Sequence, residues 1–146
     1  MADHAAIGAR LDHAGLTVAD LAAALSWYCD VFGLEPELTL RVDALDLSIE
    51  MLIHPVHGYR LELLHRPGSR TEGRPADPGE AALRGGYGHI AFDVTDLDAA
   101  HDRAVARGAK SVMPPGQSPE PGVRMAFVAD PEGNLIELLH RPPQAA

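Results

Sequence analysis

The hexapeptide ELLHRP decides the fold of this chain, because it occurs twice, at residues 62–67 and again at residues 137–142. In both copies an acidic residue leads two leucines. A strand that buries leucine seldom carries a glutamate unless another group pairs with its charge. The repetition therefore predicts a duplicated unit, and Glu62 and Glu137 become candidate functional residues at equivalent places.

A second repeated stretch lies upstream of each hexapeptide. LDHAGLTVADLAAA (residues 11–24) aligns with YGHIAFDVTDLDAA (residues 87–100), and the alignment places His13 on His89. The offset is 89 − 13 = 76 for the histidines and 137 − 62 = 75 for the glutamates. Two matches in the same order, at nearly one offset, indicate two copies of a single unit.

The duplication also sets the domain organisation. A chain of 146 residues suits one domain, or two small halves that share one core. The stretch between the copies is rich in Pro and Gly and is typical of a connecting loop. We predict a single domain, residues 1–146, with internal modules at about 11–67 and 87–142 and a linker at 68–86.

Each copy predicts a strand, then a helix, then three more strands. The helix follows Asp20 in the first copy and Asp96 in the second, and aspartate is a favoured N-cap. The later strands are expected near 37–43, 46–53 and 59–65 in the first copy, and near 110–114, 123–129 and 134–140 in the second. The predicted fold class is α+β: two tandem βαβββ modules forming a curved, cup-shaped mixed sheet with the helices on the outside.

Alternation along the strands places the repeated polar residues on one surface. Apolar residues alternate with His13 and His89 in the opening strands, and with Glu62 and Glu137 in the closing strands. The apolar face packs under the helices, so all four polar side chains are expected to face the concave surface and to gather near its middle.

Two imidazoles and two carboxylates suit a divalent metal ion. Nitrogen and oxygen donors of this kind fit Zn, Mn, Fe, Co or Ni, and fit Mg less well. Four protein ligands on an octahedral ion leave two neighbouring positions for two waters, or for a small-molecule substrate with two chelating oxygens. Each residue alone has an ordinary structural explanation. All four in symmetric places favour the metal site.

Composition excludes several classes of partner. The formal net charge is -9 and Lys110 is the only lysine, which argues against nucleic acid and against an anionic membrane surface. No apolar run approaches the length that spans a bilayer.

The N-terminus lacks the pattern of a signal peptide. Cys29 is the only cysteine, so no internal disulfide is possible and the expected compartment is cytoplasmic.

Three stretches together resemble the vicinal oxygen chelate superfamily. They are DHAGLTVADLAAALSWYCDVFGLEP, GHIAFDVTDLDAAHDRAVARGAK and FVADPEGNLIELLHRP. This superfamily includes glyoxalase I, methylmalonyl-CoA epimerase, extradiol dioxygenases and the bleomycin- and fosfomycin-resistance proteins. The resemblance covers residues 9–142 approximately. It is specific for the superfamily, and it does not choose one member.

The resemblance implies a ligand set and a chemistry. The four ligand positions of the family fall on His13, Glu62, His89 and Glu137. The pattern is similar to that of glyoxalase I and the epimerase, in which a base removes a proton next to a carbonyl and the metal holds the resulting enediolate or enolate. We therefore expect an isomerase, lyase or epimerase. The alternatives are an extradiol-type dioxygenase and a non-catalytic, ligand-sequestering resistance protein.

The resemblance also implies a catalytic base and an oligomer. Glu137 is one candidate base. Glu50, in the apolar stretch LSIEML (residues 47–52), is the other, although an ordinary strand-edge position explains it equally well. A homodimer is expected, because each module leaves sheet edges to cover. The sequence leaves open whether one chain or two chains form the site, which metal binds and which substrate is used.

Overall fold

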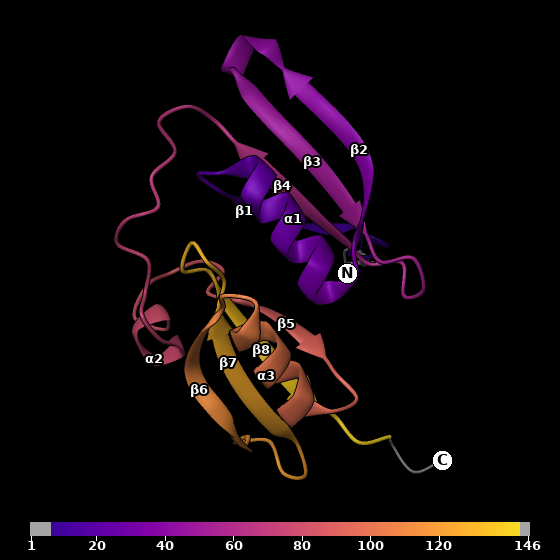
Figure 1. The fold of residues 1–146 in the computed structure, drawn as a ribbon, viewed down its shortest axis with the longest axis vertical. Coiled ribbons are helices and arrows are strands. Elements are labelled where there is room, and N and C mark those ends of the chain that lie inside the picture. The colour runs from indigo at the N-terminus through magenta and orange to yellow at the C-terminus, as the bar shows by residue number, and fades with distance from the viewer. Residues whose placement is uncertain (1–6, 144–146) are drawn as a thin grey trace, which may run out of the picture.

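The structure is a computed structural model that describes residues 7–143 and contains two βαβββ modules (Figure 1). The first module consists of β1 (His13–Thr17), α1 (Leu21–Phe32), β2 (Glu35–Val42), the short 3-10 helix η1 (Asp43–Leu45), β3 (Leu47–Ile53) and β4 (Arg60–His65). The second consists of β5 (Ile90–Asp93), α3 (Leu97–Ala106), β6 (Lys110–Gln117), β7 (Arg124–Ala129) and β8 (Leu135–His140). A short helix, α2 (Pro78–Ala81), lies between the modules.

Each module forms a four-stranded mixed sheet with the same strand order. The orders are β1-β4-β3-β2 and β5-β8-β7-β6. In both sheets the opening strand runs parallel to the closing strand, and the other neighbours are antiparallel. The predicted α+β class with two βαβββ modules is confirmed. The opening strands β1 and β5 each remain at the edge of their own sheet.

Both long helices begin where the sequence predicts. The carboxylate of Asp20 accepts a hydrogen bond from the amide of Ala23 at 2.9 Å, and that of Asp96 accepts one from the amide of Ala99 at 3.0 Å. These bonds satisfy amide groups that the first turn of a helix leaves without partners. At the end of α1, Gly33 has a φ of 66°, a left-handed conformation that glycine adopts without a steric penalty.

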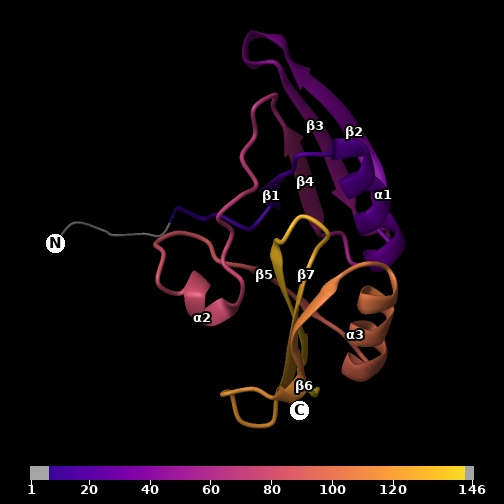
Figure 2. The ribbon, with the colours of Figure 1, turned by 60° about the vertical axis from the view of Figure 1, so that its left-hand side comes forward.

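One hydrophobic core joins the two modules. Helices α1 and α3 lie on the same side of the sheets, whereas the linker and α2 lie on the other side (Figure 2). Trp27 and Tyr28 of α1 belong to the same buried cluster as Phe92 of β5. The ring of Phe32 stacks on that of Phe92 with centroids 4.3 Å apart. The first helix therefore packs against both modules.

The turn between β7 and β8 fastens the second module to the first helix. Tyr28 donates its hydroxyl to Asp130 at 2.7 Å, and the carboxylate of Glu132 accepts the amides of Ala19 at 2.6 Å and Asp20 at 3.1 Å. Burial, together with the negative charge of Asp130, raises the pKa of Tyr28 well above its ordinary value. The strands predicted near 123–129 and 134–140 require a connection at this place; its contact with the other module is a finding of the structure.

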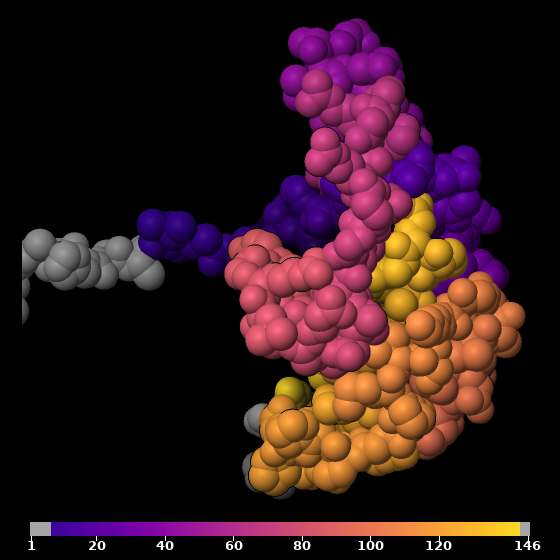
Figure 3. All heavy atoms as spheres, turned by 90° about the vertical axis from the view of Figure 1, so that its left-hand side faces the viewer, coloured from indigo at the N-terminus to yellow at the C-terminus, as the bar shows by residue number. Residues whose placement is uncertain are grey.

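The linker, which the sequence predicts to be a loop, contains a helix. Asp77 caps α2 by accepting the amide of Glu80 at 2.8 Å. Ala81 then packs in a small buried cluster with Ala129 and Leu135 on the strands of the second module. Figure 3 shows the segment between β4 and β5 passing over this face from the first module to the second. No helix in the described part of the chain is long and apolar enough to cross a membrane.

Candidate metal centre

The first module brings His13 and Glu62 together. His13 opens β1 and Glu62 lies in the neighbouring strand β4, in register with Gly15. The His13 Nε2 atom lies 3.6 Å from the Glu62 Oε2 atom. The other ring nitrogen, Nδ1, donates to the carboxylate of Asp12 at 2.7 Å. In the neutral ring this hydrogen bond favours the proton on Nδ1, which leaves the lone pair of Nε2 on the side of Glu62.

The second module repeats the pair with His89 and Glu137. His89 directly precedes β5, and Glu137 lies on β8 in register with Ala91. The His89 Nε2 atom lies 3.1 Å from the Glu137 Oε2 atom. The edge of the imidazole contacts the ring of Phe127, with centroids 5.2 Å apart at 77°. The imidazole of this pair is therefore held by an aromatic ring, whereas the imidazole of the first pair is held by a carboxylate.

The exposures of the two pairs match closely. His13 and Glu62 have side chains that are 35% and 19% exposed, and for His89 and Glu137 the values are 39% and 18%. A small residue, Gly15 or Ala91, stands opposite each glutamate and leaves it uncovered. Both pairs are accessible from solvent, which a ligand-binding group requires and a buried structural pair does not.

The structure brings these four residues together as two separate pairs. Within residues 7–143, no three His, Cys, Asp or Glu side chains lie close enough together to hold a metal ion. Both histidines line one cleft of about 560 Å³ between the modules, with Thr17, Arg74 and Asn134 on its other walls. Each pair is therefore half of a possible four-ligand site, and the histidines of both halves line a common cleft.

Glu50 lies on the opposite face of its sheet from Glu62. In the antiparallel pairing of β3 with β4, Met51 stands opposite Glu62, while Glu50 stands opposite the fully buried Leu63. Directly opposed residues point to the same face. Glu50 accepts a hydrogen bond from Thr39 at 2.8 Å. The structure therefore does not bring this candidate base to the histidine–glutamate pairs.

The remaining histidines on the closing strands have structural roles. His65 and His140 donate from Nδ1 to the backbone oxygens of Val18 and Val94, at 2.9 and 2.8 Å. Each bond ties the end of a closing strand to the end of the opening strand beside it. The equivalent contacts in both modules explain why the repeated hexapeptide contains a histidine that is not a candidate ligand.

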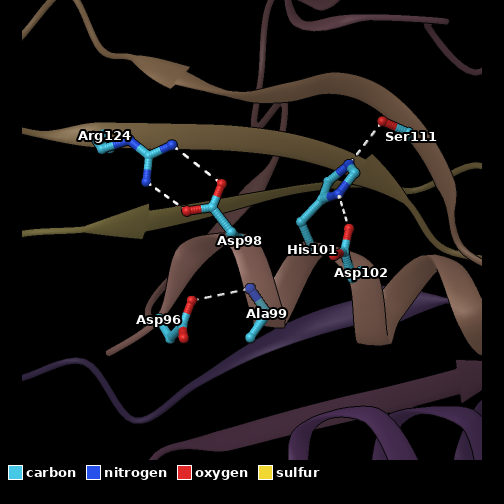
Figure 4. Close-up of polar contacts among 7 residues, drawn as sticks. All are labelled: Asp96, Asp98, Ala99, His101, Asp102, Ser111 and Arg124. Atoms are coloured by element: carbon cyan, nitrogen blue, oxygen red, sulfur yellow. Dashed lines mark hydrogen bonds and ion pairs between the residues drawn. The ribbon is translucent and has the colours of Figure 1, made fainter.

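A third kind of histidine environment lies on α3. His101 is 8% exposed, and its Nε2 atom lies 2.7 Å from the hydroxyl of Ser111, with Asp102 at 3.4 Å from Nδ1 (Figure 4). On the same helix Asp98 forms a two-point ion pair with Arg124, at 2.8 and 3.2 Å. These groups satisfy one another away from the cleft, so we assign them no site.

Three residues around the pairs were not singled out by the sequence. Asp12 directly precedes His13, and Gly88 takes its place before His89, so a comparison of the two copies could have shown the difference. The hydrogen bond that Asp12 accepts from His13 lowers the pKa of the Asp12 carboxyl group. Phe127 and Arg74 carry no such signal, because strand pairing and the course of the linker place them.

The family model of the Glyoxalase/Bleomycin resistance protein/Dioxygenase superfamily matches residues 10–138. A protein of Synechocystis sp. named as a probable lactoylglutathione lyase is 29% identical over 136 residues, which is 87% of this chain and 92% of that protein. An ethylmalonyl-CoA/methylmalonyl-CoA epimerase of Cereibacter sphaeroides is 34% identical over 102 residues, which is 69% of this chain and 72% of the epimerase.

Solved structures share the fold. A glyoxalase family protein from Bacillus cereus superposes with a TM-score of 0.74 at 25% identity, covering 96% of this chain and 97% of that one. A domain from Frankia sp., described as glyoxylase/bleomycin resistance protein/dioxygenase, gives a TM-score of 0.73 at 24% identity, with 90% and 97% covered. The arrangement of paired modules is therefore that of a known architecture.

Proposed function

The chain belongs to the Glyoxalase/Bleomycin resistance protein/Dioxygenase superfamily, and on that premise we propose that it is a divalent-metal-dependent enzyme that transfers a proton next to a carbonyl group. Isomerase, lyase and epimerase reactions share this step. The relatives named for a lactoylglutathione lyase and for a methylmalonyl-CoA epimerase support the proposal. One observation carries it: each module presents one histidine–glutamate pair, at equivalent positions and with matching exposure.

The metal ligands in this proposal are His13, Glu62, His89 and Glu137. The donors fit a divalent cation of the Zn, Mn, Fe, Co or Ni type, because two carboxylates neutralise its charge and two imidazoles provide nitrogen. Each Nε2 atom already faces the carboxylate of its own pair. The two pairs must approach each other to share one ion, because the described structure brings the four donors together only in twos.

A homodimer is the second part of the proposal. The pairs can meet by closure of the cleft in one chain, or by pairing of one module with the opposite module of a second copy. The surface beside each pair favours a second copy. Leu11 and Tyr87, each two residues before a proposed ligand, are 91% and 109% exposed. Large apolar side chains in this state are typical of a surface that another chain covers.

Glu137 is the proposed base. Its carboxylate is 18% exposed and lies beside an imidazole, so it can leave that contact to accept a proton from the carbon next to a carbonyl. Return of the proton to the neighbouring carbon gives an isomerase, and return from a second group on the other face gives an epimerase. A bound divalent cation would stabilise the negative charge that develops on the carbonyl oxygen. Glu50, on the other face of its sheet, takes no part in this step.

The substrate is proposed to be a small molecule that offers two chelating oxygens. It is proposed to bind where a pair from the module at about 11–67 meets a pair from the module at about 87–142, and residues 1–146 are proposed to form a single domain. The cytoplasm is the proposed compartment, because Cys29 is the only cysteine and forms no internal disulfide.

Metal analysis and two assays test this function. Protein purified without added metal is analysed for its elements and is then assayed with the methylglyoxal–glutathione hemithioacetal and with methylmalonyl-CoA. We expect a bound divalent metal and turnover that is lost in Glu137→Gln while substrate binding remains. Oxygen consumption would indicate a dioxygenase instead. A biological effect that survives Glu137→Gln would indicate ligand sequestration.

Mixing two inactive variants distinguishes a site within one chain from a site shared by two. His13→Ala and His89→Ala proteins are combined under conditions that exchange subunits. If two copies share each site, a mixed dimer contains one site with both histidines, and metal binding and activity return. If one chain forms the whole site, the mixture stays inactive. The second result would overturn the shared site and leave the metal function itself untouched.

A further inference from the structure

Arg74 reaches from the linker into the cleft that contains both candidate histidines. One terminal nitrogen donates to the backbone oxygen of Thr17, at the end of β1, at 3.1 Å. The other donates to the side-chain oxygen of Asn134, in the turn between β7 and β8. The guanidinium therefore lies across the junction of the two modules and lines the cleft that His13 and His89 also line.

The charge of Arg74 has no direct counter-ion. Two arginines in the described residues are half-buried, Arg60 and Arg74. Arg60 forms a two-point ion pair with Glu37, at 2.7 and 2.8 Å. Within the described chain, Arg74 has no carboxylate at ion-pair distance, and its Nε atom is buried without an acceptor. Withdrawing a charge from water without a partner is costly. Arg74 therefore differs from Arg60, whose charge is compensated by a carboxylate.

Asp130 is linked to Arg74 through the side-chain amide of Asn134. Asn134 accepts from Arg74 and donates its own amide nitrogen to Asp130 at 2.7 Å. Asp130 also accepts from the hydroxyl of Tyr28 and from the backbone amides of Glu132 and Asn134. Its oxygens are thus used by other donors. The positive charge at the cleft is not neutralised at its own position.

We propose that Arg74 anchors a carboxylate of the substrate. The inference rests on the proposed function and narrows it: the substrate would be a small carboxylic acid whose chelating oxygens lie apart from the anchored group. A guanidinium forms charge-assisted hydrogen bonds with a carboxylate in a fixed planar geometry. A local cation also favours the binding of such a substrate, because the formal net charge of the chain is -9 and disfavours anions elsewhere on its surface.

Binding of malonate to metal-free protein tests the anchor. Omitting the metal separates the outcome from the proposed function, since the metal site can fail while the anchor holds. We expect malonate to bind and to shift the NMR signal of the Arg74 Nε proton, and malonamide, its uncharged analogue, to do neither. In Arg74→Gln the affinity for malonate should fall about tenfold or more, the loss of a charged hydrogen bond.

Arg60→Gln is the matched control, because it removes the half-buried arginine that already has a carboxylate partner. Malonate should bind this variant as it binds the wild type. The proposal is overturned if malonate leaves the Arg74 Nε signal unmoved, if malonamide binds as tightly as malonate, or if Arg74→Gln binds malonate normally. The Arg74 Nε signal and the comparison with malonamide are both measured on the wild-type chain. They therefore test the proposal even if Arg74→Gln does not fold.

Discussion

The two modules of this chain carry the same pair of functional side chains in different surroundings. His13 is held by Asp12, whereas His89 lies against Phe127, which stands opposite Glu137 in the sheet. The separation between imidazole and carboxylate is 3.6 Å in the first pair and 3.1 Å in the second. The exposed fractions agree within a few per cent between the modules. The geometry of the candidate ligands is therefore repeated between the modules, whereas the residues that hold each histidine in place are different.

The concave faces of the modules differ as well. In the first module, Leu38 and Leu40 of the edge strand β2 are 51% and 47% exposed. Leu38 stands opposite Met51, and so shares the face of Glu62. In the second module, α2 packs on Ala129 and Leu135, at the end of the face that carries Glu137. The comparison teaches that one module leaves the leucines of its edge strand exposed on the face of Glu62, while the other covers part of the equivalent face with the linker.

The largest expected effect separates the two glutamates. Glu137→Gln should lower turnover about 100-fold or more, because the amide cannot accept the proton that a general base removes. Glu62→Gln is the matched change in the other module. Its amide oxygen can still act as a ligand, so we expect turnover to fall no more than about tenfold. Steady-state kinetics of both variants checks this, and equal losses would break the distinction between the modules.

The next effect concerns the support of the histidines. Asp12→Ala should weaken metal binding about 10- to 100-fold, because Asp12 fixes the proton of His13 on Nδ1 and leaves Nε2 free. Calorimetric titration with zinc measures the affinity. Nitrogen NMR of the neutral imidazole should show the Nδ1–H tautomer in the wild type and a mixture of tautomers in the variant.

The control is Asp102→Ala, which removes a carboxylate beside another histidine, His101, at a distance from the cleft. That variant should bind zinc as the wild type does. Equal affinities for Asp12→Ala and the wild type would show that both modules hold their histidine without help from a carboxylate.

A smaller effect is expected at the junction that sets the relation between the modules. Tyr28→Phe should lower the free energy of unfolding by about 1–2 kcal/mol near neutral pH, because Asp130 loses a buried hydrogen bond. Chemical denaturation measures this. Tyr87→Phe keeps the aromatic ring at a position that is exposed in the single chain, and it should leave the free energy of unfolding unchanged.

The same junction predicts a dependence on alkaline pH. The pKa of Tyr28 is raised in the folded protein, so the folded chain keeps a proton that the unfolded chain releases. Its contribution to stability is complete below roughly pH 10, the ordinary pKa of tyrosine, and is lost as the pH rises toward the folded value. Tyr28→Phe should therefore flatten the fall in stability above that pH. An unchanged slope would contradict the burial of this hydroxyl.

The smallest effect is predicted for Glu50→Gln. Its carboxylate lies on the face opposite to Glu62, so turnover should stay within about twofold of the wild type, as for substitutions away from a functional site. A large loss of turnover, with metal binding intact, would return Glu50 to the site and would require the first module to supply a base of its own.

The sequence predicts the fold of this chain well, for a physical reason. The repeat specifies each element twice, and local rules govern the N-caps at Asp20 and Asp96 and the alternation along the strands. The role of α2 was not predictable. Four residues do not establish a helical period, and the contact of Ala81 with Ala129 depends on where the linker lies on the second module.

The site was predictable only in part. Spacing places a histidine beside a glutamate in each module, because the opening and closing strands are neighbours in both sheets. The distance between the two pairs depends on the packing of the modules, through contacts such as that of Tyr28 with Asp130, which are far apart in the chain. The sheet face on which Glu50 lies could not be predicted either, because it depends on which residue stands opposite Glu50 in the neighbouring strand.

The most direct measurement counts the imidazole ligands on the bound metal. X-ray absorption spectra of zinc-loaded wild-type protein should show two imidazoles on one ion, with oxygen donors completing the set. His13→Ala and His89→Ala should each reduce the count to one. A metal in the wild-type protein that carries a single imidazole, or a count that only one of the two substitutions changes, would contradict a site shared between the two modules.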